Sequence, residues 1–249
     1  MSSFRRVALV TAGAGGLGKG IVRALVSGGY RVAFTFRATG TSPEATQRAL
    51  GSGASDARPF EADFSNPGAG AATVNAVEEH FGRVDVLVHA VGPMLYRRFE
   101  RSSVEDYDAL DRTNLRSAVE VAAAVLPGMR ERAFGRLVFF GMEGSRATAP
   151  ARGMSLYAAV KAGVVAFART LAVEEAHRGI TVNVVEPGEI RDKEADRDAS
   201  RVLPANNPTR HAGSWEDVAD TVRFLVRDES GFINGAVIAV NGGLVEPRT

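Results

Sequence analysis

The sequence predicts an α/β protein in which helices cover both faces of a doubly wound parallel sheet of about seven strands. Short apolar runs rich in β-branched residues alternate with longer amphipathic stretches along the whole chain. Most of the short runs carry no charge, which is typical of parallel strands that are covered on both sides. The alternation itself favours strand–helix–strand units rather than separate all-α and all-β regions.

Each element is assigned from its pattern. The predicted buried strands are Val7–Val10, Val32–Thr35, Val84–Val88, Leu137–Phe140, Thr181–Val185 and Val237–Val240. The predicted helices are Gly18–Ser27, Ala69–His80, Thr113–Arg132, Tyr157–Arg178 and Trp215–Arg227. Glycines stand where such helices should end, at Gly28-Gly29, Gly82, Gly135 and Gly179.

At 249 residues, the length allows one large domain or two small ones. No linker rich in Pro, Ser or Gly divides the chain, so we expect one domain over residues 1–249. The least regular segment is Glu189–Pro208, in which nine of the first thirteen residues are charged. A solvated loop and a substrate lid over a site both explain this segment, because long loops in compact domains are often functional.

The composition excludes several classes of function. Thirty basic and 29 acidic residues give a net charge of +1, which provides no field for nucleic acid or an anionic membrane. Without cysteine the chain has no disulfides and no thiolate site, and its four histidines lack metal-ligand spacing, so we expect no metal. No signal peptide and no uninterrupted run of about 18 apolar residues is found, so we expect a cytoplasmic protein. Only three basic residues are lysines, namely Lys19, Lys161 and Lys193.

A glycine-rich turn follows the first predicted strand. It reads Thr11-Ala12-Gly13-Ala14-Gly15-Gly16-Leu17-Gly18 and leads into a predicted helix. Glycines at this junction let the backbone approach a diphosphate, and the helix N-terminus attracts its charge. This context favours a Rossmann-type dinucleotide site over an ordinary strand–helix turn.

The end of the second predicted strand bears on which dinucleotide binds. An acidic residue there would bind the ribose 2′-hydroxyl of NAD, whereas an arginine suits the 2′-phosphate of NADP. The sequence reads Thr35-Phe36-Arg37, with no acid before Glu44. Arg37 therefore favours NADP(H) over NAD(H), although a plain surface arginine is the alternative in a chain so rich in them.

Tyr157 and Lys161 are four residues apart and therefore lie on one helix face. An ammonium near a phenol is expected to lower the pKa of the tyrosine, which would suit it as a general acid/base for a carbonyl/alcohol pair. An exposed helix pair is the ordinary explanation of this spacing. The preceding nucleotide-binding half and the scarcity of lysine favour the catalytic one.

Together these motifs resemble the short-chain dehydrogenase/reductase family, in the branch that includes the 3-oxoacyl-acyl-carrier-protein reductases. The resemblance covers essentially the whole chain, and it adds Asn114 as the catalytic asparagine. It implies that Tyr157 is the acid/base, that Lys161 is its partner, and that the final strand joins a homodimer or homotetramer. The candidate cofactor-binding residues are Thr11, Gly13, Gly16, Leu17, Gly18, Arg37, Asp63, Phe64, Ala90, Gly92, Lys161, Pro187, Gly188 and Ile190.

Four positions depart from the family pattern. Ala12 replaces a glycine, and Asp192 stands where a threonine often contacts the cofactor. His89 begins the segment that occupies the place of the family's N-N-A-G, of which only the last glycine, Gly92, matches. Met142 aligns with the catalytic serine, and methionine cannot donate a hydrogen bond to a carbonyl oxygen. Ser145 and Ser155 are the candidate substitutes, and Ser145 is the one that we carry forward as catalytic.

The resemblance implies an oxidoreductase that transfers a hydride between NADP(H) and a small or carrier-linked carbonyl substrate, with a 3-oxoacyl thioester as the narrower expectation. For an acidic carrier protein, the docking residues would be Arg130 or Arg132 and Arg178, although ordinary surface charge explains them equally well. The departures leave one alternative of a different class. It is a nucleotide-binding protein with little or no turnover that acts as a sensor or an interaction subunit.

Overall fold

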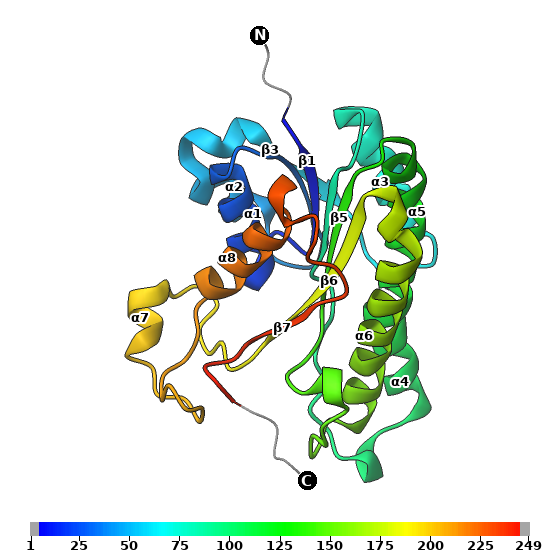
Figure 1. Ribbon diagram of the computed structural model, residues 1–249. Coiled ribbons are helices and arrows are strands. Elements are labelled where there is room, and N and C mark those ends of the chain that lie inside the picture. Colours follow the sequence, from blue (N-terminus) through cyan, green and yellow to red (C-terminus); the bar gives the residue numbers. More distant parts are fainter. Residues whose placement is uncertain (1–4, 245–249) are drawn as a thin grey trace.

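A seven-stranded, all-parallel sheet in the order β3-β2-β1-β4-β5-β6-β7 passes through the centre of the molecule (Figure 1). This computed structural model describes residues 5–244. The strands are β1 (Val7–Thr11), β2 (Arg31–Phe36), β3 (Ala57–Glu61), β4 (Val86–His89), β5 (Gly135–Phe140), β6 (Ile180–Pro187) and β7 (Val237–Val240). The predicted doubly wound fold is therefore confirmed.

Helices form a layer on each side of the sheet (Figure 1). One core lies between the sheet and α3 (Ala69–Phe81), α5 (Ser117–Glu131) and α6 (Ser155–Glu175). The other lies under α1 (Gly16–Ser27) and α8 (Trp215–Leu225). The shorter helices are α2 (Pro43–Leu50), α4 (Val104–Asp111) and α7 (Arg197–Arg201).

The strand β3 is the strand that the sequence patterns missed, and the short helices α2, α4 and α7 were not assigned either. Strand β3 reads Ala-Arg-Pro-Phe-Glu and lies at the edge of the sheet beside β2. An edge strand is half exposed and tolerates proline, so it carries neither a continuous apolar run nor a clean alternation. The expectation that Gly135 ends a helix was also wrong. Gly135 begins β5, and the left-handed residue after α5 is Ala133, with a φ of 48°.

Helix α6, with the turn that follows it, is long and apolar enough to span a membrane by length and composition alone. Its residues Val164, Val165 and Ala168 are instead buried in the core against the sheet. Charged residues interrupt this helix, so the sequence shows no uninterrupted apolar run at this place.

The strand order places a functional crevice. From β1 the chain proceeds to β2 and β3 on one side, and β4 to β7 then follow on the other side of β1. The connections after β1 and β4 therefore leave the carboxyl ends of these two strands in opposite directions. In open parallel sheets this switch point is where ligands bind. The glycine-rich turn after β1 and the segment Ala90–Gly92 after β4 both lie at this edge.

The segment Glu189–Pro208 is tied to the body of the protein rather than hanging as an open loop. It contains α7, and Gly213 donates a backbone hydrogen bond to the carbonyl of Glu189 at 3.1 Å. Arg197 pairs with Asp217 and Asp220 of α8, at 2.8 Å in each case. These carboxylates raise the pKa of the Arg197 guanidinium, Asp220 most strongly.

Candidate active site

The glycine-rich turn after β1 has no room for side chains at two positions. A Cβ on Gly13 would lie 2.6 Å from Phe34 Cβ, and one on Gly18 would lie 2.2 Å from the carbonyl oxygen of Ala12. Helix α1 begins here with no acidic residue in its first turn and no side chain capping its N-terminus. Its free N–H groups therefore remain available to an anion such as a diphosphate.

Ala12, which replaces a glycine of the family pattern, has a strained backbone conformation. Its φ is +53°, in the left-handed region that glycine adopts freely and an L-residue resists. Its N–H is held by Thr35 Oγ1 at 2.9 Å, so the conformation is enforced by the neighbouring strand. The family's glycine thus answers a backbone requirement that this chain meets with alanine.

A cavity of about 340 Å³ opens beside this turn, at the carboxyl ends of β1, β2 and β4. Five of the predicted cofactor residues line it, namely Arg37, Asp63, Phe64, Ala90 and Gly92. Sequence patterns missed Thr41 and Ser65, which also line it and stand in loops without a motif. The Asp63 carboxylate accepts hydrogen bonds from Ser65 Oγ at 2.7 Å and from the Ser65 N–H at 2.9 Å. These bonds lower the pKa of Asp63.

His89 is buried beneath this cavity as a link in a hydrogen-bonded chain. Its Nδ1 lies 3.1 Å from Thr11 Oγ1, and its Nε2 lies 2.9 Å from Ser117 Oγ. The Ser117 hydroxyl donates to the Thr113 carbonyl, so it accepts from a protonated Nε2. Thr11 then donates to Nδ1 while its oxygen accepts the N–H of Ala90. Burial, with a smaller contribution from the charge of Lys161, lowers the pKa of His89 to about 3.

Tyr157 and Lys161 lie on the inward face of α6, as the spacing predicts. Both are buried, with 8% and 3% of their surfaces exposed, and Lys161 Nζ lies 5.6 Å from the centroid of the tyrosine ring. Lys161 Nζ donates to the Phe140 carbonyl at the end of β5, at 2.8 Å. Burial lowers the pKa of Lys161 to about 8.

The expected depression of the tyrosine pKa does not occur in the protein by itself. Burial raises the pKa of Tyr157 to about 12, and it outweighs the ammonium, which is directed toward the Phe140 carbonyl. The phenol therefore holds its proton throughout the neutral range. This property suits a general acid more than a general base.

Asn114 lies on a five-residue π-helical turn, Arg112–Arg116, between α4 and α5. Its Nδ2 donates to the Leu110 carbonyl at 3.0 Å, and its buried Oδ1 has no partner among residues 5–244. A Cβ on Gly92 would lie 2.5 Å from that Oδ1 and 2.9 Å from Lys161 Nζ. The fold thus brings Asn114, Lys161 and the cofactor cavity together around Gly92, and π-helical turns of this kind are frequent at functional sites.

Comparison with known proteins agrees with this geometry. A family model described as enoyl-(acyl carrier protein) reductase matches residues 12–245. The chain is 32% identical to acetoacetyl-CoA reductase of Allochromatium vinosum over 96% of its own length and 98% of that protein. It is 33% identical to a 3-oxoacyl-acyl-carrier-protein reductase of Vibrio cholerae, over 96% and 97%. The chain belongs to the short-chain dehydrogenase/reductase family.

Solved structures of similar proteins have the same fold. A putative 3-oxoacyl reductase from Bacillus thuringiensis superposes with a TM-score of 0.89 at 31% identity, covering 98% of this chain and all of that one. A blue fluorescent protein from a metagenomic library, solved in complex with NADPH, superposes with a TM-score of 0.81 at 31% identity. This second match covers 96% of this chain and 97% of that one.

Within this short-chain dehydrogenase/reductase, the loop after β5 is built around a buried carboxylate. Ser145 Oγ donates to Glu186 Oε1 at 2.6 Å and accepts the N–H of Met142 at 3.1 Å. The N–H of Arg146 also donates to Glu186 Oε1, at 2.9 Å. The Ser145 hydroxyl, the candidate catalytic donor, is thus occupied by Glu186 in this structure. Sequence analysis did not single out Glu186, because a lone acid at a strand end carries no signal.

Met142 itself packs in the apolar cluster that contains Tyr157, Leu110 and Val160. It also lines a separate cavity of about 530 Å³, whose walls include Ser145, Ser155 and small residues of α6. The thioether therefore provides an apolar wall beside the tyrosine, and its alignment with the family's catalytic serine stays a prediction.

The remaining candidates lie around the turn after β6. Gly188 donates its N–H to the Val240 carbonyl at 3.0 Å, and Ile190 packs against the core under α1 and α8. The Asp192 carboxylate accepts the N–H of Glu194 at 2.8 Å, so it is turned toward its own backbone. Pro187, Gly188 and Ile190 therefore shape this turn, and their cofactor contacts stay predictions.

The candidate carrier-docking arginines are far from Tyr157 within one protomer. Arg130 and Arg178 both pair with Glu175, at 2.5 and 3.3 Å, near the carboxyl ends of α5 and α6. Arg132 donates to the Val84 carbonyl at 2.8 Å. Because Tyr157 lies near the opposite end of α6, Arg130 and Arg178 do not lie beside the candidate active site, and their role in docking a carrier stays a prediction.

Proposed function

We propose that the protein is an NADP(H)-dependent reductase of a small or carrier-linked carbonyl substrate, with 3-oxoacyl thioesters as the preferred class. The observation that carries this proposal is the convergence of Lys161 and Asn114 around Gly92, which lines the cavity beside the glycine-rich turn, with Tyr157 next to Lys161 on α6. The relatives named as reductases of acetoacetyl-CoA and of 3-oxoacyl-acyl-carrier-protein support the substrate class.

NADPH, when bound, supplies a hydride to the carbonyl carbon. Tyr157 donates its phenolic proton to the carbonyl oxygen, so hydride and proton together convert the ketone into an alcohol. Lys161, held by the Phe140 carbonyl, supplies positive charge beside the phenolate that forms. Asn114 presents an acceptor oxygen from its fixed π-helical turn, and this oxygen would hold a water that returns a proton toward the tyrosine.

Arg37 supports NADP(H) over NAD(H). It lines the cavity at the end of β2, and no acidic residue of β2 competes for a ribose hydroxyl there. A guanidinium binds phosphate through several parallel N–H donors, which is the recognition that a 2′-phosphate requires.

Tyr157 would orient the substrate oxygen without the usual serine. Met142 contributes no donor, and the Ser145 hydroxyl would have to leave Glu186 to reach a substrate. Because the loss of one such donor typically costs about 10²–10³ in rate, we expect a slower enzyme than its serine-containing relatives. Met142→Ser should then raise kcat.

The test is NADPH oxidation by the purified protein with acetoacetyl-CoA, a carrier-linked 3-oxoacyl thioester, β-ketoesters and quinones. Turnover of a thioester that is lost in Tyr157→Phe supports the proposal. Nucleotide binding without turnover of any of these substrates contradicts it.

The pH profile provides a second readout. Lys161, with a pKa of about 8, is protonated below that pH and neutral above it, so the charge beside Tyr157 is lost as the pH rises. We expect kcat for reduction to be flat between pH 6 and 7 and to fall above about pH 8. A rate that rises through this range would contradict the assigned role.

A nucleotide-binding protein with little turnover is the second candidate, and Met142 is the observation that favours it. Under this proposal the protein binds NADPH, and Tyr157→Phe changes neither binding nor any measured rate. The presence of Asn114 and Lys161 beside Gly92, with Tyr157 next to Lys161, supports the reductase instead.

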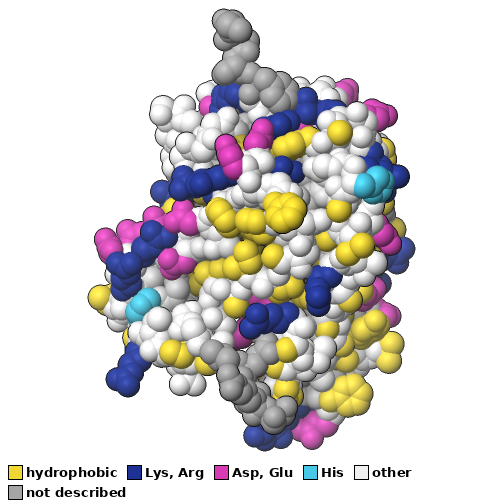
Figure 2. Space-filling view, viewed as in Figure 1, with side chains coloured by type: hydrophobic (Ala, Val, Ile, Leu, Met, Phe, Trp, Pro, Cys, Tyr) yellow, Lys and Arg dark blue, Asp and Glu magenta, His cyan; other side chains and the backbone are white. Residues whose placement is uncertain are grey.

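Self-association and location complete the proposal. Apolar side chains gather between α8 and β7 on the face shown in Figure 2, and exposed Phe224 and Phe232 belong to this part of the chain. β7 is the sheet's last strand, so we propose that this face forms the homodimer or homotetramer contact. Light scattering would test the assembly. The cytoplasmic location stays a prediction.

A further inference from the structure

Two of the three lysines have no role in the proposed reaction, and both lie at the glycine-rich turn. Lys19 is in the first turn of α1, and Lys193 lies in the segment after β6, about 170 residues later in the chain. Arginine supplies every other basic position, so the use of lysine at this one place asks for a physical reason.

Lys193 lies across Gly16, the first residue of α1. A Cβ on Gly16 would stand 3.3 Å from Lys193 Cδ, and one methylene group separates that carbon from the ammonium-bearing end. Lys193 forms no ion pair within residues 5–244. Its side chain therefore lies against the turn, and no carboxylate among these residues forms an ion pair with its ammonium.

Lys19 anchors the same segment from the other side. Its Nζ pairs with Glu194 Oε2 at 2.5 Å, and the Lys19 side chain is 18% exposed. A cation in the first turn of a helix opposes the helix dipole, so the Glu194 carboxylate relieves an unfavourable charge while it fixes its neighbour, Lys193. The pair joins the segment after β6 to the helix that would receive the diphosphate.

The neighbouring charges of this segment are already engaged, whereas Lys193 has no ion-pair partner among residues 5–244. Arg191 is paired with Glu189 at 2.5 Å, and the carboxylate of Asp192 accepts the N–H of Glu194. Glu194 itself is taken by Lys19. Lysine suits a diphosphate approached along a flexible stem, because its ammonium is a compact point charge with three rotatable donors.

We propose that Lys193 is a cofactor-binding residue whose ammonium binds a diphosphate oxygen of NADP(H), positioned by the Lys19–Glu194 ion pair. It compensates for Asp192, which offers no donor at the position where the family often has a threonine. The inference rests on the proposed function, since it requires that NADP(H) is the cofactor.

The test measures dissociation constants by calorimetry for two nucleotides, NADPH and adenosine 2′-monophosphate. The second retains the adenine, the ribose and the 2′-phosphate but has no diphosphate. We expect Lys193→Gln to weaken NADPH about 10-fold, which is about 1.4 kcal/mol, and to leave adenosine 2′-monophosphate unchanged. Arg37→Gln should weaken both nucleotides, because they share the 2′-phosphate.

Arg191→Gln is the matched control. It removes one positive charge from the same exposed segment, two residues away, and should change NADPH affinity less than 2-fold. Unfolding temperatures without nucleotide should be equal in wild type and in both glutamine variants, because both side chains are exposed.

Three results would overturn the inference. They are unchanged NADPH affinity in Lys193→Gln, an equal loss in Arg191→Gln, and a parallel loss of adenosine 2′-monophosphate binding. Failure of the proposed function is distinguishable, because it is measured on the wild-type protein, which would then either not bind NADPH or bind it without reducing any carbonyl substrate.

The anchor is tested by a double-mutant cycle. Lys19→Gln and Glu194→Gln should each weaken NADPH about 3-fold, and the double variant should be no worse than either, because both remove one ion pair. A double variant whose loss of NADPH affinity equals the product of the two single losses would contradict the positioning role.

Discussion

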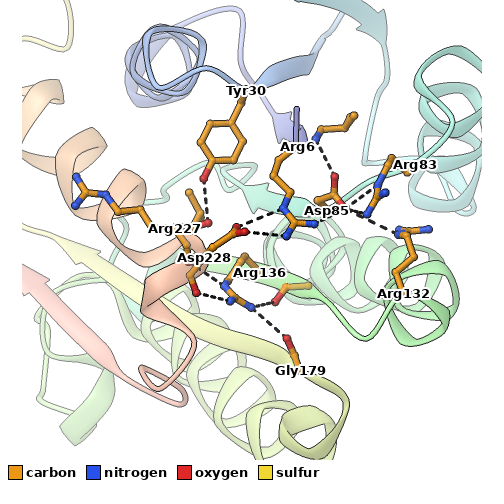
Figure 3. Close-up of polar contacts among 12 residues, drawn as sticks. Arg6, Tyr30, Arg83, Asp85, Arg132, Arg136, Gly179, Arg227 and Asp228 are labelled. Atoms are coloured by element: carbon orange, nitrogen blue, oxygen red, sulfur yellow. Dashed lines mark hydrogen bonds and ion pairs between the residues drawn. The ribbon is translucent and has the colours of Figure 1, made fainter. Parts of the chain in front are cut away.

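Buried polar groups differ between the amino-terminal and the carboxyl-terminal ends of the parallel strands. At the amino-terminal edge, Asp85 is fully buried and accepts hydrogen bonds from Arg83 and from the backbone of Val7, with Arg6 and Arg132 close by (Figure 3). At the carboxyl-terminal edge, Asn114 Oδ1 and Glu186 Oε2 are buried without a partner among the residues that the structure describes. The buried carboxylate at the amino-terminal end is thus satisfied within the protein, although Arg132 Nε and Thr181 Oγ1 lack a hydrogen-bond partner there within residues 5–244, whereas the carboxyl-terminal end presents unpaired acceptors that a ligand can complete.

Arg136 extends the amino-terminal network to the backbone. Its guanidinium donates to the carbonyls of Arg227, Gly135, Gly179 and Asp228, at 2.9 to 3.2 Å (Figure 3). Burial lowers the pKa of this arginine. Arg136 therefore joins three segments of the chain and contributes stability. At the carboxyl ends of the strands, burial of Lys161 instead perturbs its pKa.

The variant Tyr157→Phe should show the largest difference between an effect on activity and an effect on stability. It removes the proton donor and leaves packing intact, so we expect kcat for reduction to fall about 10³-fold, with the unfolding free energy within about 1 kcal/mol of wild type. Steady-state kinetics and urea unfolding measure the two quantities. A variant that loses stability together with activity would assign the tyrosine to the core.

Asp85→Asn should do the reverse. Removing the charge leaves several arginines without their buried partner, and we expect a loss of about 3 kcal/mol in unfolding free energy with kcat unchanged. Asp56→Asn is the matched control, because its pair with Arg5 is one-third exposed at 2.7 Å and should cost under about 1 kcal/mol. Equal losses would show that burial does not distinguish the pairs.

Acid should weaken the protein through the histidine under the cofactor cavity. The pKa of His89 is about 3 in the folded protein and 6.5 when it is unfolded, so the unfolded chain binds more protons between these values. Stability is retained above pH 6.5 and lost as the pH falls. We expect about 2 kcal/mol less at pH 5 than at pH 7. His89→Asn should remove this share of the loss, and an unchanged pH dependence would contradict it.

The smallest effect concerns the strained turn. Ala12→Gly removes the left-handed penalty but adds freedom to the unfolded chain, and we expect a gain of about 0.5 kcal/mol in chemical denaturation. Ala14→Gly is the control, because Ala14 has no positive φ and should instead lose stability. A loss in both variants would show that the position-12 strain is not relieved by glycine.

The sequence predicted elements whose physics is local. Apolar β-branched runs identify strands covered on two sides, and the four-residue spacing of Tyr157 and Lys161 places them on one face. The edge strand β3, with its proline and arginine, has no such signature. The Ser145–Glu186 bond could not be predicted either, because it joins residues 41 apart whose side-chain directions depend on packing. The pKa of Tyr157 was misjudged because burial is not visible in a residue pair.

The hydrogen bond from Lys161 to Phe140 has a consequence for change at this site. Its acceptor belongs to the last residue of β5, upstream of the loop that carries Met142 and Ser145. The position of Lys161 is therefore fixed by the sheet and not by the loop that follows β5. The loop can therefore change in length or composition, in nature or by engineering, while Lys161 keeps its position, so that a new substrate preference need not displace the residues proposed to transfer the proton.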